Sequence, residues 1–278
     1  MLPEGTVLRV LRALAYFALT LPLMPLQALL VAFGGDWADR FPVFYHRQVC
    51  RILGIRVVRG GVPSTSRPTL FVANHTSYLD IEILGASAPL SFVSKADVAG
   101  WPVFGWLAKL QRTVFIDRQR RSVSRQRNAI ADRLKAGGNL VLFPEGTSGD
   151  GQRVLPFKSA LFAAVLDAAQ AHGVTVQPVS VAYLRLDGLP LGRAWRPYFA
   201  WYGDMEMLPH LWAMLGLGHL TVAVDFHAPV RAADFASRKE LAEHCERVIS
   251  AGLAAALAGR GAAPPLPVPS AAPALAAQ

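Results

Sequence analysis

The sequence predicts an α/β fold with a largely parallel sheet flanked by helices, preceded by an N-terminal membrane-anchoring helix or helical hairpin. Three observations predict this fold. Short apolar runs alternate with longer segments of helical pattern along the chain. Several of the short runs are apolar throughout, as expected of strands that are covered on both faces. No charged residue occurs between Arg12 and Asp36, which is typical of a segment that contacts lipid.

The composition favours a membrane protein over a nucleic-acid-binding one. The 278 residues are 53% hydrophobic and only 17% charged, with a net charge of +9. A basic surface suits anionic partners, either phospholipid or nucleic acid. The apolar excess has no role in nucleic-acid binding, and no groove-reading motif is present, so we expect no nucleic-acid partner. Cys50 and Cys245 are far apart, which argues against a disulfide framework or a zinc site.

The N-terminal anchor is predicted over residues 1–35. Its apolar run, residues 13–32, is about long enough to cross a bilayer core of roughly 20 residues. This run is longer than a signal-peptide core and lacks a clear cleavage site, so we expect it to be retained. Pro22 and Pro25 disfavour a straight helix, which leaves one kinked spanning helix or a short re-entrant or interfacial hairpin. A buried core helix is the alternative to an anchor.

The main domain is predicted over residues 36–258, and an Ala/Pro-rich segment, residues 259–278, reads as a disordered tail. Strands and helices alternate through the main domain. We predict strands at 55–59, 69–73, 91–94, 113–116, 140–143, 175–182 and 221–226, and helices at 37–53, 77–86, 124–136, 157–172 and 236–257.

A histidine and an aspartate follow the apolar strand 69–73. His75 comes directly after this strand, and Asp80 lies one turn inside the next helix, which Ser77 can cap. A carboxylate at that position can fold back onto the imidazole, fix its tautomer and direct the other nitrogen towards a substrate hydroxyl. The pair resembles a catalytic triad without its serine, with the substrate hydroxyl as nucleophile. Alternatively, Asp80 only favours the helix dipole from the first turn.

Two further polar blocks follow apolar strands. Glu145 lies in the turn Phe143-Pro144-Glu145-Gly146-Thr147-Ser148, where its carboxylate could accept hydrogen bonds from a polyol. Arg118 follows the strand 113–116, and its planar guanidinium is suited to binding phosphate or carboxylate. The alternatives are an ordinary strand–turn–helix connection and a surface arginine paired with Asp117.

Four blocks together resemble the ordered motifs of the glycerolipid acyltransferase family, the family of 1-acylglycerol-3-phosphate acyltransferases. They are Asn74-His75-x-x-x-x-Asp80, Phe115-Ile116-Asp117-Arg118, Phe143-Pro144-Glu145-Gly146-Thr147 and Val176-Gln177-Pro178-Val179.

The resemblance implies a role for each matching residue. It implies that His75 is the catalytic base and Asp80 its charge-relay partner. The substrate-binding residues that it implies are Asn74, Arg118, Glu145, Gly146 and Thr147. Lys95 matches a less constant lysine, and the fourth block would be mostly structural and close to the acyl chain.

Two positions depart from the family pattern. The second motif usually opens with glycine where this chain has Arg112, and the third usually continues with arginine where it has Ser148. The run 146–162 and the segment Trp201-Tyr202-Gly203-Asp204-Met205 resemble the branch that acylates lyso-ornithine lipid. That acceptor carries a carboxylate but no phosphate, which is compatible with a lost arginine, although Arg112 or Arg153 could replace it.

We therefore expect a membrane O-acyltransferase that moves an acyl chain from acyl-ACP or acyl-CoA to the free hydroxyl of lyso-ornithine lipid, lysophosphatidate or both. The donor would be a substrate, and no metal or other cofactor is required, because a thioester is already activated. The resemblance implies the bacterial inner membrane, with the catalytic domain on the cytoplasmic side. The alternatives are a non-catalytic lipid-binding protein and an acyl-ester hydrolase on the same fold.

Overall fold

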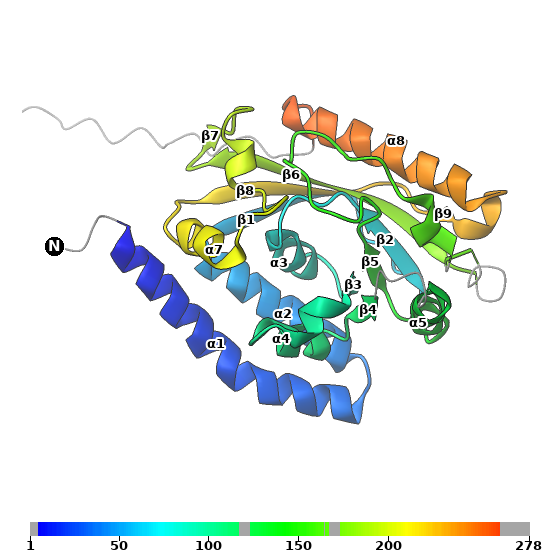
Figure 1. The fold of residues 1–278 in the computed structure, drawn as a ribbon, viewed down its shortest axis with the longest axis horizontal. Helices are drawn as coiled ribbons and strands as arrows, with labels where there is room; N and C mark the ends of the chain where they lie inside the picture. Colours follow the sequence, from blue (N-terminus) through cyan, green and yellow to red (C-terminus); the bar gives the residue numbers. More distant parts are fainter. Residues whose placement is uncertain (1–4, 117–122, 164, 167–172, 262–278) are drawn as a thin grey trace, which may run out of the picture.

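A nine-stranded sheet forms the centre of the fold (Figure 1). The computed structural model describes residues 5–116, 123–163, 165–166 and 173–261. The main path of the sheet runs β1-β8-β6-β2-β5-β3-β4, and β7 and β9 pair with β6 outside this path. The strands are β1 (Ile55–Gly60), β2 (Thr69–Ala73), β3 (Ser91–Lys95), β4 (Val114–Ile116), β5 (Leu140–Leu142), β6 (Thr175–Leu186), β7 (Leu189–Pro190), β8 (Leu220–Phe226) and β9 (Val230–Arg231).

Most of the sheet is parallel, as predicted. Strands β6, β2, β5, β3 and β4 all run in one direction. Strand β8 is antiparallel to β6, and β1 is parallel to β8, so these two strands form a reversed pair at one edge. The carboxyl ends of β2, β5 and β3 therefore lie at the same edge, where open α/β sheets place their ligands.

Helices cover both faces of the sheet (Figure 1). Strand β2 shows why, since its side chains alternate between two buried layers: Phe71 and Ala73 pack on one side, and Leu70 and Val72 on the other. The first layer includes side chains of α2 and α3, and the second includes side chains of α5 and α8. The helices after the first are α2 (Trp37–Ile52), α3 (Leu79–Gly85), α4 (Phe104–Leu110), α5 (Val123–Lys135), α7 (Met207–Leu215) and α8 (Arg238–Leu257).

Two predictions about the elements need correction, and two helices were missed. The strand predicted at 175–182 continues to Leu186, because its last residues pair with β8 and β7. The helix predicted at 157–172 does not begin at Phe157: the chain is extended there and enters a 3-10 turn at Ser159–Phe162. Within the rest of that prediction, 163, 165 and 166 are helical, and 164 and 167–172 lie outside the described residues. Helices α4 and α7 were not predicted.

The N-terminal segment is one continuous helix, α1 (Thr6–Phe33), that contains both prolines. A hairpin within this segment was therefore the wrong alternative, and Figure 1 shows a bend part-way along the helix instead. Its buried residues are polar and bond to the body of the protein. Thr20 bonds to Tyr45 of α2 at 3.0 Å, Arg12 to backbone carbonyls at the end of α7 and just beyond it, and Gln27 to backbone carbonyls on α2 and α4.

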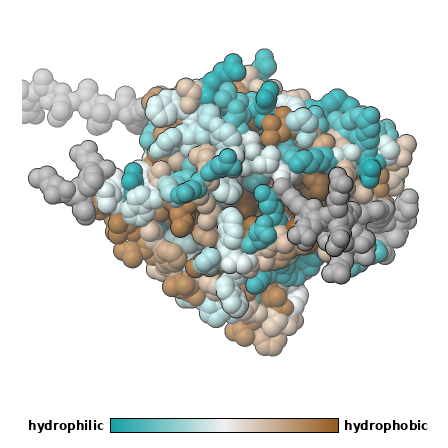
Figure 2. All heavy atoms as spheres, viewed as in Figure 1, coloured by the Kyte–Doolittle hydropathy of each residue, from teal (hydrophilic) through white to brown (hydrophobic). Residues whose placement is uncertain are grey.

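The apolar face of α1 is exposed. Only 11% of its most apolar stretch is buried, so the alternative of a buried core helix was also wrong. Phe33 at its end is 86% exposed, and Trp37 just beyond it is 69% exposed. Figure 2 shows apolar side chains gathered over the α1 side of the molecule, away from the hydrophilic side near α8. The length and composition of α1 would allow it to cross a membrane, and a large exposed apolar surface of this kind is typical of a membrane-associated protein. Of the predicted tail, only 259–261 are described.

Candidate active site

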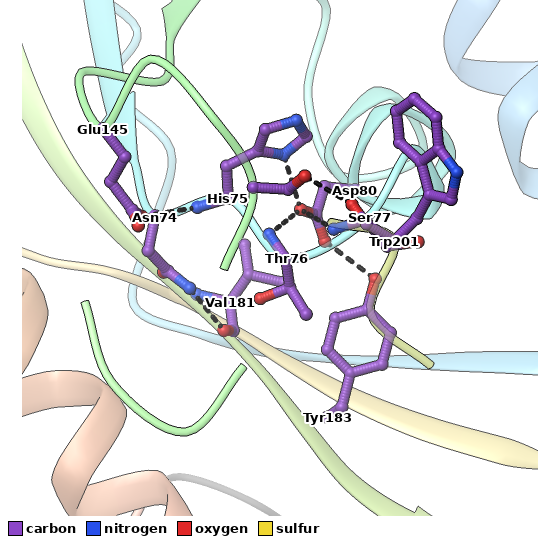
Figure 3. Close-up of polar contacts among 10 residues, drawn as sticks. Asn74, His75, Thr76, Ser77, Asp80, Glu145, Val181, Tyr183 and Trp201 are labelled. Atoms are coloured by element: carbon purple, nitrogen blue, oxygen red, sulfur yellow. Dashed lines mark hydrogen bonds and ion pairs between the residues drawn. The ribbon is translucent and has the colours of Figure 1, made fainter. Parts of the chain in front are cut away.

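The loops after β2 and β5 meet at the carboxyl edge of the sheet. The two strands are paired in register, with Val72 opposite Leu142. The backbone N–H of His75 donates to Glu145 Oε1 at 2.8 Å, and the N–H of Gly149 donates to the His75 carbonyl at 2.9 Å. The structure thus brings the first and third sequence blocks together, as Figure 3 shows.

His75 and Asp80 form a hydrogen-bonded pair. His75 Nδ1 lies 2.9 Å from Asp80 Oδ2, and the Asp80 side chain is completely buried. The same oxygen accepts the backbone N–H groups of Thr76 at 2.7 Å and Ser77 at 3.0 Å, while Oδ1 accepts the hydroxyl of Tyr183 at 2.8 Å. Only a carboxylate accepts all four bonds. In the neutral imidazole, this network places the ring proton on Nδ1 of His75 and leaves the lone pair on Nε2.

Tyr183 holds Asp80 from beneath (Figure 3). It comes from the second half of β6 and is fully buried. Burial, together with the charge of Asp80, raises the pKa of Tyr183 well above its usual value, so the phenol stays protonated and donates. The carboxylate is therefore fixed by donors from both the loop after β2 and a separate strand.

The start of α3 differs from the prediction. We expected Ser77 to cap a helix beginning at Tyr78, but α3 begins at Leu79 and has no side-chain cap bond from Ser77. The carboxylate of Asp80 binds the free N–H groups ahead of the helix instead. Asp80 therefore both orders the start of α3 and orients His75, so the two interpretations of this residue are compatible.

The ring of His75 faces a large cavity. It stacks on Phe143, with ring centroids 4.1 Å apart and an interplanar angle of 20°. His75 and Phe143 both line a cavity of about 560 Å³. In the described part of the chain, no hydrogen-bond partner of Nε2 was found, so this nitrogen is available to a ligand.

Most of the cavity wall is apolar. It extends from His75 between helices α1, α2 and α4. Polar groups concentrate beside His75, at the turn of 146–148, and at the far wall, where His46 contacts Glu82 Oε2 at 2.6 Å. Representative apolar lining residues are Leu23, Met24, Phe41, Val98, Phe104 and Leu107.

Glu145 holds the loops together. Its Oε1 accepts the N–H of His75, and its Oε2 accepts the N–H of Leu155 at 2.9 Å. The side chain is 2% exposed and does not line the cavity, whereas Gly146 and Thr147 do. Burial raises the pKa of Glu145 to about 7, against the lowering effect of its two backbone bonds. Both carboxylate oxygens are thus bound to the protein rather than presented to a ligand.

Asn74 also acts within the protein. Its amide pairs with the backbone of Val181 in both directions, accepting from the N–H at 2.8 Å and donating to the carbonyl at 3.0 Å. The residue is 2% exposed, and its side chain does not line the cavity. Asn74 therefore fastens the end of β2 to β6 beneath His75.

The remaining basic residues of the motifs lie elsewhere. Arg118 is outside the described residues, and Lys95 lines the cavity. Arg112 pairs with Asp39 on α2 and does not line the cavity, nor does Arg153. The suggestion that either arginine replaces the missing one of the third motif is therefore unsupported by its position.

Ser148 stands where the family usually has arginine, and it bonds to another loop. Its hydroxyl donates to the carbonyl of Trp201, and the N–H of Trp201 donates to the Thr76 carbonyl at 3.0 Å. Trp201 is thereby held beside the catalytic loop, and its side chain lines the cavity.

Sequence reasoning missed Tyr183, Lys158 and the function of Phe143. Tyr183 carried no signal, because it is one hydroxyl in an apolar strand far along the chain from Asp80. Lys158, which lines the cavity, lies in the run 146–162 that carried the lyso-ornithine resemblance, so that run did contain a usable signal. Within the described residues, no cluster of three or more His, Cys, Asp or Glu could hold a metal ion.

Comparison with known proteins identifies the family. The pattern of the Acyltransferase family matches residues 55–182. The chain is 45% identical to the lyso-ornithine lipid O-acyltransferase of Brucella abortus, over 92% of this chain and 97% of that protein. The chain belongs to the acyltransferase family. The matched residues contain His75, Asp80 and Glu145, so these three residues lie inside the family domain of this acyltransferase.

Other relatives of the acyltransferase are named for two different lipids. The lyso-ornithine lipid O-acyltransferase of Rhizobium meliloti is 41% identical, covering 91% of this chain and 90% of that protein. The 1-acyl-sn-glycerol-3-phosphate acyltransferase of Neisseria gonorrhoeae is 35% identical, covering 70% of this chain and 73% of that protein.

A solved structure shows the same fold. The crystal structure of the 1-acyl-sn-glycerophosphate (LPA) acyltransferase from Thermotoga maritima superposes with a TM-score of 0.64, covering 90% of this chain and 96% of that chain at 21% identity. The expected acyltransferase-like fold is confirmed.

Proposed function

We propose that the acyltransferase moves an acyl chain from a thioester, acyl-ACP or acyl-CoA, to the free hydroxyl of lyso-ornithine lipid, with His75 as general base. One observation carries the proposal. The imidazole of His75 is oriented by the buried carboxylate of Asp80 and lines a largely apolar cavity. A base beside an apolar chamber is what acyl transfer to an alcohol requires.

The reaction follows from this geometry. Nε2 of His75 accepts the proton of the acceptor hydroxyl while that oxygen bonds to the thioester carbonyl carbon. The tetrahedral intermediate then expels the thiolate, which takes the proton back from the imidazolium. Asp80 stabilises the imidazolium between these steps. A positioned base of this kind contributes about 10²–10⁴-fold.

The backbone of the turn 146–148 is the proposed donor to the oxyanion. The turn borders the same cavity as His75, and in the described part of the chain the N–H groups of Thr147 and Ser148 have no hydrogen-bond acceptor. The left-handed conformation of Gly146, with φ at 69°, reverses the chain so that the turn follows the cavity wall. Such donors stabilise the developing charge and together often exceed the contribution of the base.

The apolar part of the cavity is the proposed site of the acyl chain. Its volume of about 560 Å³ lies within the range of small-molecule sites. Each methylene that it removes from water contributes about 0.8 kcal/mol. Because the cavity passes between α1 and α2, the same helices that face lipid outside would enclose a lipid chain inside.

The acceptor is assigned from similarity and from Ser148. The relatives named as lyso-ornithine lipid acyltransferases match this chain at 45% and 41% identity, and the one named for 1-acyl-sn-glycerol-3-phosphate at 35%. Ser148 replaces a guanidinium suited to phosphate with a hydroxyl that is bonded to Trp201. Both observations favour a carboxylate-bearing acceptor over a phosphate-bearing one.

The proposed location is one leaflet of the bacterial inner membrane, with the catalytic domain on the cytoplasmic side. Helix α1 is bonded to the body at three points along its length by Arg12, Thr20 and Gln27. A helix crossing the bilayer would draw those partners into hydrocarbon, whereas one lying in the interface would not. Acyl-ACP and acyl-CoA are available on the cytoplasmic side.

An acceptor assay tests the proposal. Membranes containing wild type or His75→Ala at matched protein level receive labelled acyl-ACP or acyl-CoA, with lyso-ornithine lipid, lysophosphatidate or no acceptor. We expect labelled ornithine lipid from wild type and loss of at least 100-fold in the variant. Labelled phosphatidate alone would reassign the acceptor. Free fatty acid without an acceptor would indicate a hydrolase, and equal activity of His75→Ala would exclude His75 as the base.

A further inference from the structure

Lys158 lies at the polar end of the active-site cavity and has no role in the proposed steps of acyl transfer. It lines the cavity together with His75 and the turn 146–148. Its side chain lies across the backbone of Gly146: a Cβ placed on that glycine would be 2.8 Å from Nζ and 3.1 Å from Cδ of Lys158. The ammonium is therefore next to the turn to which the acceptor must bind if His75 is to reach its hydroxyl.

The backbone around Lys158 is fixed by three hydrogen bonds. The N–H of Lys158 donates to the Pro144 carbonyl at 2.9 Å, and the preceding N–H, of Phe157, donates to Glu246 of α8 at 2.8 Å. Leu155 is held by Glu145. These bonds explain why the chain is extended here rather than helical, and they hold Lys158 over the turn.

The charge of Lys158 is not neutralised by the protein. Within the described residues, no carboxylate lies within 4.0 Å of Nζ. Glu145 lies in the turn beside Lys158, and its two carboxylate oxygens accept the backbone N–H groups of His75 and Leu155. The carboxylate among the lining residues, Glu82, is bonded to His46.

We propose that Lys158 binds the anionic group, carboxylate or phosphate, in the head group of the acceptor lipid. This rests on the proposed function, because it presumes a lysolipid whose hydroxyl is attacked beside His75. A carboxylate or phosphate would pair with the ammonium, which is the chemistry common to both candidate acceptors. With Ser148 in place of an arginine, Lys158 supplies a single point charge rather than a fork, which suits a carboxylate.

The anion is assigned to the acceptor rather than to the donor. In a lysolipid, the head-group anion is only a few bonds from the hydroxyl that reacts at His75. In acyl-CoA or acyl-ACP, the phosphates are separated from the thioester by the whole pantetheine arm. Lys158 lies beside the turn 146–148, next to the reaction centre, so the nearer anion is the better match.

Steady-state kinetics in membranes or detergent distinguish an anion on the acceptor from one on the donor. For Lys158→Met we expect the acceptor KM for lyso-ornithine lipid to rise about tenfold or more, equivalent to roughly 1.4 kcal/mol. We expect kcat to change by less than about threefold and the donor KM to stay unchanged. Lys158→Arg should recover most of the acceptor affinity. Lys135→Met, on the last turn of α5, is a matched control expected to behave as wild type.

A modified acceptor makes the assignment specific. The methyl ester of lyso-ornithine lipid lacks the carboxylate charge, so wild type should bind it about tenfold more weakly, and Lys158→Met should not distinguish it from the acid. An unchanged acceptor KM in Lys158→Met, or equal discrimination by both proteins, would overturn the inference, and a raised donor KM would assign Lys158 to the donor. Failure of wild type to acylate lyso-ornithine lipid would refute the proposed function instead.

Discussion

Replacing Asp80 with asparagine should abolish most of the catalytic rate while preserving the fold. In Asp80→Asn, the amide oxygen can accept the three donors that now meet at Oδ2, and the amide NH₂ can donate to Tyr183 in place of accepting from it. The hydrogen-bond positions are therefore all filled. What is lost is the negative charge beside the imidazolium that forms during the reaction.

The magnitude follows from the distance. His75 Nδ1 and Asp80 Oδ2 are 2.9 Å apart, and two unit charges at this distance attract by about 6 kcal/mol at an effective dielectric constant of about 20. Part of this is recovered by the neutral hydrogen bond, which contributes about 1 kcal/mol. The remaining difference corresponds to about 10³–10⁴-fold in kcat.

The assay is the initial rate of labelled ornithine lipid formation at saturating donor and acceptor, in membranes with equal amounts of wild type and variant. Asp234→Asn, on an exposed turn where Asp234 pairs with Arg231, is the matched control and should retain full activity. A kcat for Asp80→Asn within about threefold of wild type, with unchanged folding, would refute the assignment of Asp80 to the imidazolium.

Three further predictions concern the residues around the pair. Asn74→Ala should lower the free energy of unfolding by about 2–4 kcal/mol, because both backbone groups of Val181 lose a buried partner, and should leave both KM values unchanged; a raised KM at full stability would contradict this. Burial raises the pKa of Glu145 from 4.5 to about 7, so between these pH values the folded protein keeps a proton that the unfolded chain releases. Stability from this group is therefore highest below pH 4.5 and falls by up to about 3 kcal/mol as the pH rises through 7. Thermal unfolding should show that wild type loses stability relative to Glu145→Gln as the pH rises from 4 to 8, because the variant has no carboxyl group that titrates at this position. A stability difference between the two proteins that stays constant over this pH range would refute the prediction. Ser148→Arg should break the bond to Trp201 and supply a guanidinium, which raises the preference for lysophosphatidate over lyso-ornithine lipid by about tenfold in competition assays; an unchanged ratio would show that Ser148 does not set the acceptor.

The sequence predicted the strand ends well, because their signals are local. His75 follows the predicted strand 69–73 and Glu145 follows the predicted strand 140–143, and parallel pairing of these strands is enough to bring the two loops together. The fold class could therefore be predicted before any contact was known.

Roles that depend on long-range contacts could not be predicted in the same way. Asn74 and Glu145 both carry polar side chains at strand ends, which is the pattern of a ligand-binding residue. In the structure their hydrogen-bonding groups are taken by Val181, His75 and Leu155. Nothing in the local sequence distinguishes a side chain that binds a ligand from one that binds a neighbouring backbone.

Long-range contacts also bear on the N-terminal helix. Pro22 and Pro25 left a kinked helix or a hairpin open, because proline removes a helical hydrogen bond, and the structure has one helix with a bend. The helix nevertheless continues, with the buried Thr20 and Gln27 bonded to neighbouring elements on either side of the prolines. Tertiary bonds outweigh the local preference here.

The departure at Ser148 has a different meaning in the structure than in the sequence. In the sequence, the lost arginine was compatible with an acceptor that carries no phosphate, with Arg112 or Arg153 as the alternative source of a cation. In the structure, Ser148 ties Trp201 to the cavity wall, and the cation beside the turn comes from Lys158. The positive charge at this end of the cavity is thus present in another form, on a flexible stem lying over Gly146. Under the proposed role of Lys158, a point charge beside the turn and the aromatic side chain of Trp201 would select the acceptor by where its anion lies relative to its hydroxyl. This is the property that separates an amino-acid head group from a glycerol phosphate.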